Sequence, residues 1–273
     1  SSDLSLGEIE VQIAEYHKKI TSLGSRDITV RVMTPDGYES GAKRYPVVYI
    51  NDGQDVFRDE DILWGECSMD YENYYRSYGR FLPDIIIVAL VCPRDREERT
   101  ALYSPFTCKP EKGGAMIRGQ GVEYLRWIAE ELKPWIDGAY RTRSGREDTG
   151  IMGYSTGGLF ALCAGLLRPD IFTRVAALSS SVYLWLDQFQ ELLDTASFGH
   201  LKRIYMDVGT NEFGRFTTKE EFLEGAELIY RTCLQKGVSA DRIKYNRYPG
   251  ATHSQLEWKL RFPDALRWIF MDC

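Results

Sequence analysis

The sequence predicts an α/β protein with a mostly parallel central sheet and helices on both faces. Three observations lead to this fold class. Short β-branched runs alternate with helical patterns along the chain, as in layered α/β folds. Residues 85–91 are apolar without interruption, which is typical of a strand buried on both faces. A glycine-rich turn at residues 153–157 separates a strand-like segment from an apolar helical one. We expect one domain over residues 1–273, with residues 1–20 as an N-terminal extension.

The first half of the chain carries three strand-like segments and one helical pattern. Residues 26–33 alternate polar and apolar, as in a half-exposed strand. Residues 46–50 and 85–91 are β-branched runs and predict two further strands. Residues 122–137 carry apolar side chains at helical spacing. The pattern therefore gives three strands and one long helix before the glycine-rich turn.

The second half continues the alternation. Strands are expected at residues 149–152, 175–178, 204–208 and 243–248, and helices at 156–167, 218–236 and 263–271. Thr218 and Glu221 resemble a capping box at the start of the long helix, and Gly237 stands where such a helix usually ends. Because ligands of parallel sheets bind beyond the carboxyl ends of the strands, we expect the chemistry in the loops that follow them.

Composition excludes several classes of protein. The 34 basic and 40 acidic residues give a net charge of −6, which argues against nucleic acid or an anionic membrane as the main partner. The longest apolar run, residues 85–92, is far shorter than the roughly 20 residues of a membrane helix. The six cysteines are scattered without a CxxC pair, so we expect no metal and a cytoplasmic setting. The chain does not begin with Met, which leaves a removed leader open.

Ser155 is the candidate nucleophile. It is the serine of Gly153-Tyr154-Ser155-Thr156-Gly157, which fits the G-x-S-x-G pattern. The pattern alone is weak, but here a strand precedes it and an apolar helix follows, as a nucleophile elbow requires. The alternative is an ordinary glycine-rich turn between a strand and a helix. In the elbow interpretation, the Thr156 amide lies at the helix start and faces a developing oxyanion.

His253 is the candidate base among only three histidines. It lies in the loop after the last predicted strand, in the chain order Ser, acid, His. His17 precedes the first predicted strand in a charged segment and is expected at the surface. His200 stands just before a strand, which puts it at the opposite end of the sheet.

Two carboxylates compete for the place of the acid that orients the histidine. Glu212 lies in the loop beyond residues 204–208, and Asp207 lies within that strand. We favour Glu212, because the loop has the reach. Gln54 is the candidate for the second oxyanion amide, since Gly53 would let the backbone approach a ligand.

Aromatic side chains are frequent in the loops that follow the strands. Trp64, Tyr154 and Trp185 are our candidates for substrate contact, and further aromatics of these loops are Tyr71, Tyr74, Tyr75, Tyr183 and Trp258. They either fill the core or stack on an aromatic or sugar-like ester. Arg94, Arg96 and Arg99 follow a buried strand. They bind an anionic group or form a solvated face.

Several segments resemble the "Putative esterase" family of α/β-hydrolases. They are residues 45–57 (YPVVYINDGQDVF), 131–136 (ELKPWI), 140–143 (YRTR), 153–158 (GYSTGG), 168–172 (RPDIF), 209–212 (GTNE), and His253 with 261–268 (RFPDALRW). The family includes esterase D, feruloyl and acetyl-xylan esterases, siderophore esterases and mycolyltransferases. The resemblance implies an α/β-hydrolase fold, with Ser155, His253 and Glu212 as the triad and amides of Gln54 and Thr156 for the oxyanion. Many members have His at the position of Asp52, and Asp at that of Glu212.

We therefore expect a serine esterase that forms an acyl-enzyme and needs no cofactor. Its expected partner is a small-molecule or saccharide-linked ester, such as a siderophore trilactone or a feruloyl or acetyl ester. Two alternatives are an acyltransferase with the same triad and a catalytically silent binding module.

Overall fold

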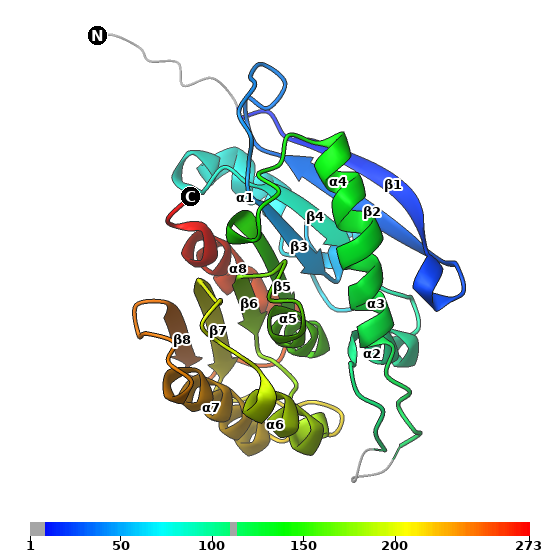
Figure 1. Ribbon diagram of the computed structural model, residues 1–273, viewed down its shortest axis with the longest axis vertical. Coiled ribbons are helices and arrows are strands. Elements are labelled where there is room, and N and C mark those ends of the chain that lie inside the picture. Colours follow the sequence, from blue (N-terminus) through cyan, green and yellow to red (C-terminus); the bar gives the residue numbers. More distant parts are fainter. Residues whose placement is uncertain (1–8, 110–113) are drawn as a thin grey trace.

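A single eight-stranded sheet runs through the computed structural model, which describes residues 9–109 and 114–273 (Figure 1). The strand order is β1-β2-β4-β3-β5-β6-β7-β8. The pairs β1–β2 and β2–β4 are antiparallel, and all the others are parallel. The strands are β1 Gln12–Ile20, β2 Arg26–Thr34, β3 Val47–Asn51, β4 Ile86–Leu90, β5 Thr149–Tyr154, β6 Arg174–Leu178, β7 Arg203–Gly209 and β8 Ile243–Tyr248.

Helices cover both faces of this sheet and enclose two apolar cores. One core lies between the sheet and α2 to α7, and the other lies between the sheet and α1 with α8. Burial on both faces explains why β3 to β6 are almost entirely apolar. The helices are α1 Tyr71–Tyr78, α2 Arg96–Tyr103, α3 Gly121–Trp127, α4 Lys133–Ala139, α5 Thr156–Leu167, α6 Leu186–Thr195, α7 Lys219–Gln235 and α8 Gln255–Phe270.

The predicted α/β fold class is confirmed, and most predicted elements are present. The helix expected at residues 156–167 has those limits in α5. The capping box of Thr218 and Glu221 is formed at the start of α7. The helix expected at 122–137 consists of α3 and α4, joined by a π-helical turn at Ile128–Leu132. Strong local periodicity therefore located these elements correctly.

The last helix was predicted too short. α8 begins at Gln255, after Ser254 as its N-cap residue, and contains Pro263 in its interior. The prediction placed Pro263 at the helix start, where proline is most common. Here the buried face of α8 packs against the sheet and keeps the helix continuous through the proline. The reason is tertiary packing rather than local preference.

The expected N-terminal extension is partly an edge strand. Residues 12–20 form β1 and pair with β2, and residues 1–8 lie outside the described residues. His17 was expected before the first strand, but it lies within β1, opposite Thr29. Its side chain is 79% exposed, so the predicted surface position is correct. Helices α1, α2 and α6 were not predicted, because each is short.

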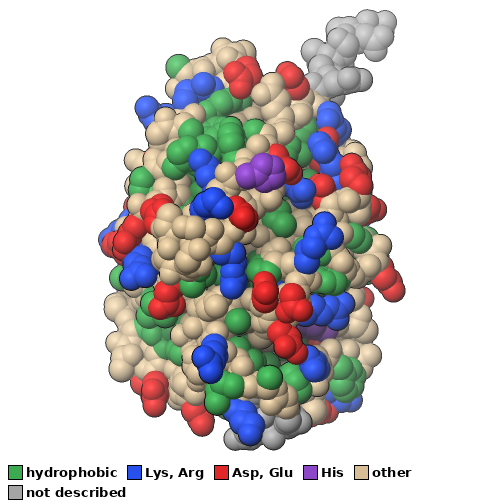
Figure 2. All heavy atoms as spheres, turned by 90° about the vertical axis from the view of Figure 1, so that its right-hand side faces the viewer, with side chains coloured by type: hydrophobic (Ala, Val, Ile, Leu, Met, Phe, Trp, Pro, Cys, Tyr) green, Lys and Arg blue, Asp and Glu red, His purple; other side chains and the backbone are tan. Residues whose placement is uncertain are grey.

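The surface carries both signs of charge. On the face in Figure 2, basic and acidic side chains are interspersed and do not gather into one patch. Within residues 9–109 and 114–273, no helix is both long and apolar enough to cross a membrane.

Candidate functional site

Ser155 occupies a sharp turn between β5 and α5. Its backbone has φ 56° and ψ −127°, a region that L-residues rarely adopt and that costs about 1–3 kcal/mol. A Cβ atom on Gly153 would lie 2.3 Å from the carbonyl oxygen of Gly157. Position 153 therefore requires glycine, because the start of α5 packs directly against it. The turn points Ser155 out of the carboxyl end of the sheet, as the sequence predicted.

The structure brings Ser155, His253 and Glu212 together in one hydrogen-bonded chain. Ser155 Oγ lies 2.9 Å from His253 Nε2, and His253 Nδ1 lies 2.9 Å from Glu212 Oε2. The ring of His253 packs against Phe222 and Trp258, with centroid distances of 4.6 and 4.8 Å. These contacts fix the imidazole between the hydroxyl and the carboxylate. In this geometry an imidazole can take a proton from a hydroxyl.

The two candidate acids differ in their contacts, although Ser179 donates to both of them. Glu212 is fully buried, and its Oε1 accepts hydrogen bonds from Ser179 Oγ (2.6 Å) and the Gly209 amide (2.5 Å). Asp207 accepts hydrogen bonds from Arg261 (3.1 Å) and from the hydroxyl of Tyr205 (3.0 Å). Burial raises the pKa of Asp207 to about 6, although Arg261 opposes the shift. Of the two carboxylates, Glu212 is the one that contacts His253.

His200 lies at the other end of the sheet, before β7. Its Nε2 lies 2.7 Å from the carbonyl oxygen of Gly165, late in α5. The predicted polarity of the sheet thus separates His200 from Ser155, which stands at the first turn of the same helix.

The two predicted oxyanion segments are adjacent. Thr156 is the first residue of α5, so its amide has no acceptor within the helix. Gln54 lies in a 3₁₀ turn, Gly53–Asp55, that follows β3. Gly53 was expected to let the backbone approach a ligand. Instead, a Cβ atom there would lie 2.5 Å from the Leu90 amide nitrogen, so the glycine serves the packing of this turn against β4.

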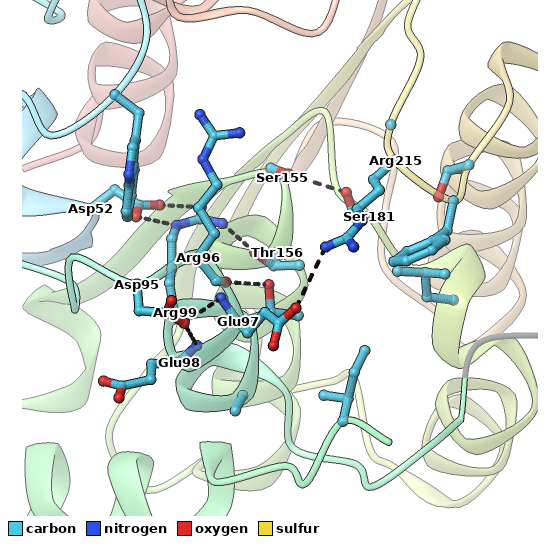
Figure 3. Close-up of a pocket in the computed structure, with 18 of the residues that line it drawn as sticks. Asp52, Asp95, Arg96, Glu97, Glu98, Arg99, Ser155, Thr156, Ser181 and Arg215 are labelled. Atoms are coloured by element: carbon cyan, nitrogen blue, oxygen red, sulfur yellow. Dashed lines mark hydrogen bonds and ion pairs between the residues drawn. The ribbon is translucent and has the colours of Figure 1, made fainter. Parts of the chain in front are cut away.

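Arg99 joins these two segments (Figure 3). Its Nε and Nη2 each lie 2.6 Å from an oxygen of Asp52, and its Nη1 donates to Thr156 Oγ1 at 2.7 Å. The side chain of Arg99 is only 14% exposed and that of Asp52 only 1%. Asp52 holds the pKa of Arg99 well above its usual range. The negative charge that Asp52 brings to this turn is therefore neutralised, and Arg99 is not part of a solvated face.

A cavity of about 910 Å³ opens beside Ser155 and His253. Trp64 and Tyr154, two of the candidates for substrate contact, line it, and so does Trp258, which stacks on Tyr154 at 4.2 Å between ring centroids. Trp185 does not line it. Its ring is fully buried in the first apolar core, at the end of the 3₁₀ turn Tyr183–Trp185 that leads into α6. Among the other loop aromatics, Tyr71 and Tyr75 belong to α1 and the second core.

Three further side chains at this site were not singled out from the sequence. Ser181 Oγ lies 3.2 Å from Ser155 Oγ. Asp55 accepts a hydrogen bond from the Tyr154 hydroxyl, and burial raises its pKa to about 7. Ser179 binds Glu212 from the end of β6. The only available signal was their position after strands. Within the described residues, no group of three His, Cys, Asp or Glu side chains could hold a metal ion.

Known proteins resemble the chain over most of its length. The family model described as "Putative esterase" matches residues 21–269. Among curated relatives, "Uncharacterized protein YbbA" of Bacillus subtilis (strain 168) is 23% identical over 254 residues, which cover 90% of this chain and 93% of that protein.

Two solved structures illustrate the fold. An IroE-like serine hydrolase from Shewanella oneidensis has 22% identity and a TM-score of 0.74, and the match covers 96% of this chain and 81% of that one. The enterobactin esterase FES from Shigella flexneri, solved in the presence of enterobactin, has 20% identity and a TM-score of 0.70. The match covers 95% of this chain and 58% of that one. Both are hydrolases of the α/β-hydrolase type. Together with the family match, they support a carboxylic ester hydrolase. Since the family model spans residues 21–269, the chain belongs to the "Putative esterase" family of α/β-hydrolases.

Proposed function

We propose that this chain is a serine esterase in which Ser155 is the nucleophile, His253 the general base and acid, and Glu212 the acid that orients the imidazole. The observation that carries the proposal is the unbroken chain of two 2.9 Å hydrogen bonds from Ser155 through His253 to Glu212. Nucleophile, base and orienting acid within hydrogen-bond reach are the signature of covalent acyl transfer.

The reaction has two halves. His253 Nε2 takes the proton of Ser155 as Oγ forms a bond to the ester carbonyl carbon. The tetrahedral intermediate then breaks its bond to the alcohol oxygen, which leaves with the proton from His253. Water attacks the acyl-enzyme with the help of the same imidazole, and the carboxylic acid is released.

The oxyanion is stabilised by the backbone amides of Thr156 and Gln54. The start of α5 supports this role of Thr156, because the helix dipole favours negative charge there. Arg99 contacts both segments through Asp52 and Thr156 Oγ1. Its rigid, planar guanidinium holds the two segments in register.

The substrate that fits this cavity best is an aryl or sugar-linked ester. A volume of about 910 Å³ is at the upper end of ordinary ligand sites, roughly 300–1,000 Å³. Trp64 and the stacked pair of Tyr154 and Trp258 offer aromatic faces to a ring. The similar esterase from Shigella flexneri was solved with enterobactin. A siderophore trilactone is therefore a leading choice, beside feruloyl and acetyl esters.

Ser155→Ala tests the mechanism. We expect kcat on p-nitrophenyl acetate to fall by about 10³- to 10⁶-fold, and a fluorophosphonate probe to label the wild type but not the variant. Near wild-type turnover in Ser155→Ala would refute the serine mechanism, and an unlabelled wild type would favour a silent binding module.

The substrate class needs a separate panel. Values of kcat/KM for a trilactone siderophore, methyl ferulate and acetylated xylan rank the three candidates. Added alcohols identify an acyltransferase, because the acyl group would then go to the alcohol in preference to water.

A further inference from the structure

The hydrogen bonds around Glu212 fix more than its position. Ser179 follows β6, has its side chain fully buried, and adopts φ 46°. Its Oγ lies 2.6 Å from Glu212 Oε1, 2.9 Å from Trp258 Nε1 and 3.4 Å from Arg261 Nη2. A strained, buried serine with three polar contacts is held in place by those contacts.

The direction of each of these hydrogen bonds follows from the chemistry of the groups. Indole and guanidinium nitrogens can only donate. Trp258 and Arg261 therefore fill the two lone pairs of Ser179 Oγ, and the hydroxyl proton of Ser179 has only Glu212 Oε1 to go to. The Gly209 amide donates to the same oxygen at 2.5 Å.

Because these donors bind Oε1 of Glu212, the other carboxylate oxygen, Oε2, is left to accept from His253. Arg261 Nη2 lies 4.0 Å from Oε1, so a third donor group lies near this oxygen beside Ser179 and the Gly209 amide. An ionised carboxylate only accepts, so Nδ1 of His253 carries the ring proton and Nε2 is the free acceptor. Nε2 then faces Ser155 Oγ at 2.9 Å, which is the tautomer that a general base needs.

We propose that Ser179 is a positioning residue, whose hydroxyl proton orients Glu212 and so sets the tautomer of His253. The expected effect on kcat rests on the proposed function. The tautomer of His253, in contrast, is a property of the resting protein and can be measured without any reaction. Ser179 touches neither substrate nor reacting atoms. It acts through Glu212, at the far side of the imidazole from Ser155.

Ser179→Ala and Ser179→Gly test the proposal as a pair. Both remove the hydroxyl, but glycine tolerates a positive φ better than alanine, so the two variants differ in stability. We expect the same loss in both: kcat falls about 10- to 100-fold, the range of one hydrogen bond to a charged group, and KM changes little. If the loss of kcat instead differs between the two variants in step with their unfolding midpoints, the role of Ser179 is structural and the proposal fails.

Ser68→Ala is the matched control. Ser68 is also fully buried, and its hydroxyl also donates to a carboxylate, Asp59 Oδ1, at 2.7 Å. It lies before α1 and does not contact His253, so we expect kcat within about threefold of wild type. A loss as large as that of the Ser179 variants would assign the effect to buried serines in general.

The direct readout is the ¹⁵N NMR spectrum of the histidines at a pH where the rings are neutral. The chain has only three histidines, and a His253→Gln sample identifies the signals of His253. In the wild type we expect a protonated Nδ1 and an unprotonated Nε2, and in both Ser179 variants a mixture of tautomers. An unchanged tautomer would overturn the proposal. Failure of Ser155→Ala to lose activity would refute the serine mechanism and leave the tautomer result standing.

Discussion

Glu212→Gln replaces a buried carboxylate with an amide of nearly the same shape. The oxygen of the amide would keep the hydrogen bonds from Ser179 and Gly209, which meet Oε1 at 2.6 and 2.5 Å. The NH₂ group would then face His253 Nδ1, at the place where Oε2 now lies 2.9 Å away. A donor facing a donor turns the ring to the tautomer with a proton on Nε2, which cannot accept one from Ser155.

The expected loss is about 10⁴-fold in kcat, or roughly 5.5 kcal/mol of activation free energy. KM should change little, because the contact stabilises the transition state rather than bound substrate. The assay is steady-state hydrolysis of p-nitrophenyl esters, normalised to sites that react with a fluorophosphonate. Thermal unfolding of the same samples shows whether the fold is kept.

Asp207→Asn is the matching variant, which decides whether Glu212 or Asp207 is the acid that orients His253. Asp207 bonds Arg261 and Tyr205, but burial raises its pKa to about 6, so its loss should cost less stability than the roughly 3–5 kcal/mol of a broken buried ion pair. Glu212 remains 4.0 Å from Arg261 as a second counter-ion, which reduces that cost. We expect kcat per active site to fall less than about tenfold. If Asp207→Asn cost more activity than Glu212→Gln, the reasoning would be refuted and the acid would be Asp207.

Three further predictions concern the cavity. Arg99→Lys keeps the positive charge beside Asp52 but loses the planar fork of the guanidinium. We therefore expect kcat to fall about 10- to 100-fold at nearly constant KM, measured by steady-state kinetics on titrated enzyme. A rise in KM alone would contradict this expectation. Asp55→Asn tests the raised pKa of about 7 against the usual 3.8. The native carboxyl holds its proton to higher pH than the unfolded one, so its contribution to wild-type stability should fall by about 4 kcal/mol as the pH rises from about 4 to 7. In urea unfolding at several pH values, the variant should lack this contribution and keep that of Asp207, whose pKa is raised to about 6. Trp185→Phe should leave KM for aryl esters within about twofold, and Trp64→Ala should raise it; the reverse order would return Trp185 to the binding site.

The predictable part of the site follows from local rules. The Ser155 turn is encoded by its flanking glycines, of which Gly153 is sterically required. His253 and Glu212 stand directly after the last two parallel strands, where the topology of the sheet puts ligand-binding groups. Each position could be inferred from a few neighbouring residues, and the sheet then brought the three together.

The unpredicted part depends on contacts between distant segments. In the sequence, Arg99 is one of three arginines that follow a strand. Only its ion pair with Asp52, which the structure shows, distinguishes its role from that of Arg96. Ser179 gains its place through Trp258 and Arg261, some eighty residues away along the chain. The error on Trp185 has the same origin, because a loop aromatic and a core aromatic look alike until the path of α6 is known.

Buried carboxylates surround this site, and each is stabilised in a different way. Asp52 forms a bidentate ion pair with Arg99, Glu212 accepts two short hydrogen bonds, and Asp207 and Asp55 have pKa values raised to about 6 and 7. Protonation of these last two stabilises the fold as the pH falls from 7 toward 4, since their native pKa values exceed those of the unfolded chain. A decline of activity over that range therefore does not come from unfolding driven by these groups. Such a decline would therefore have to arise at the site itself, where the proposed mechanism requires a neutral imidazole.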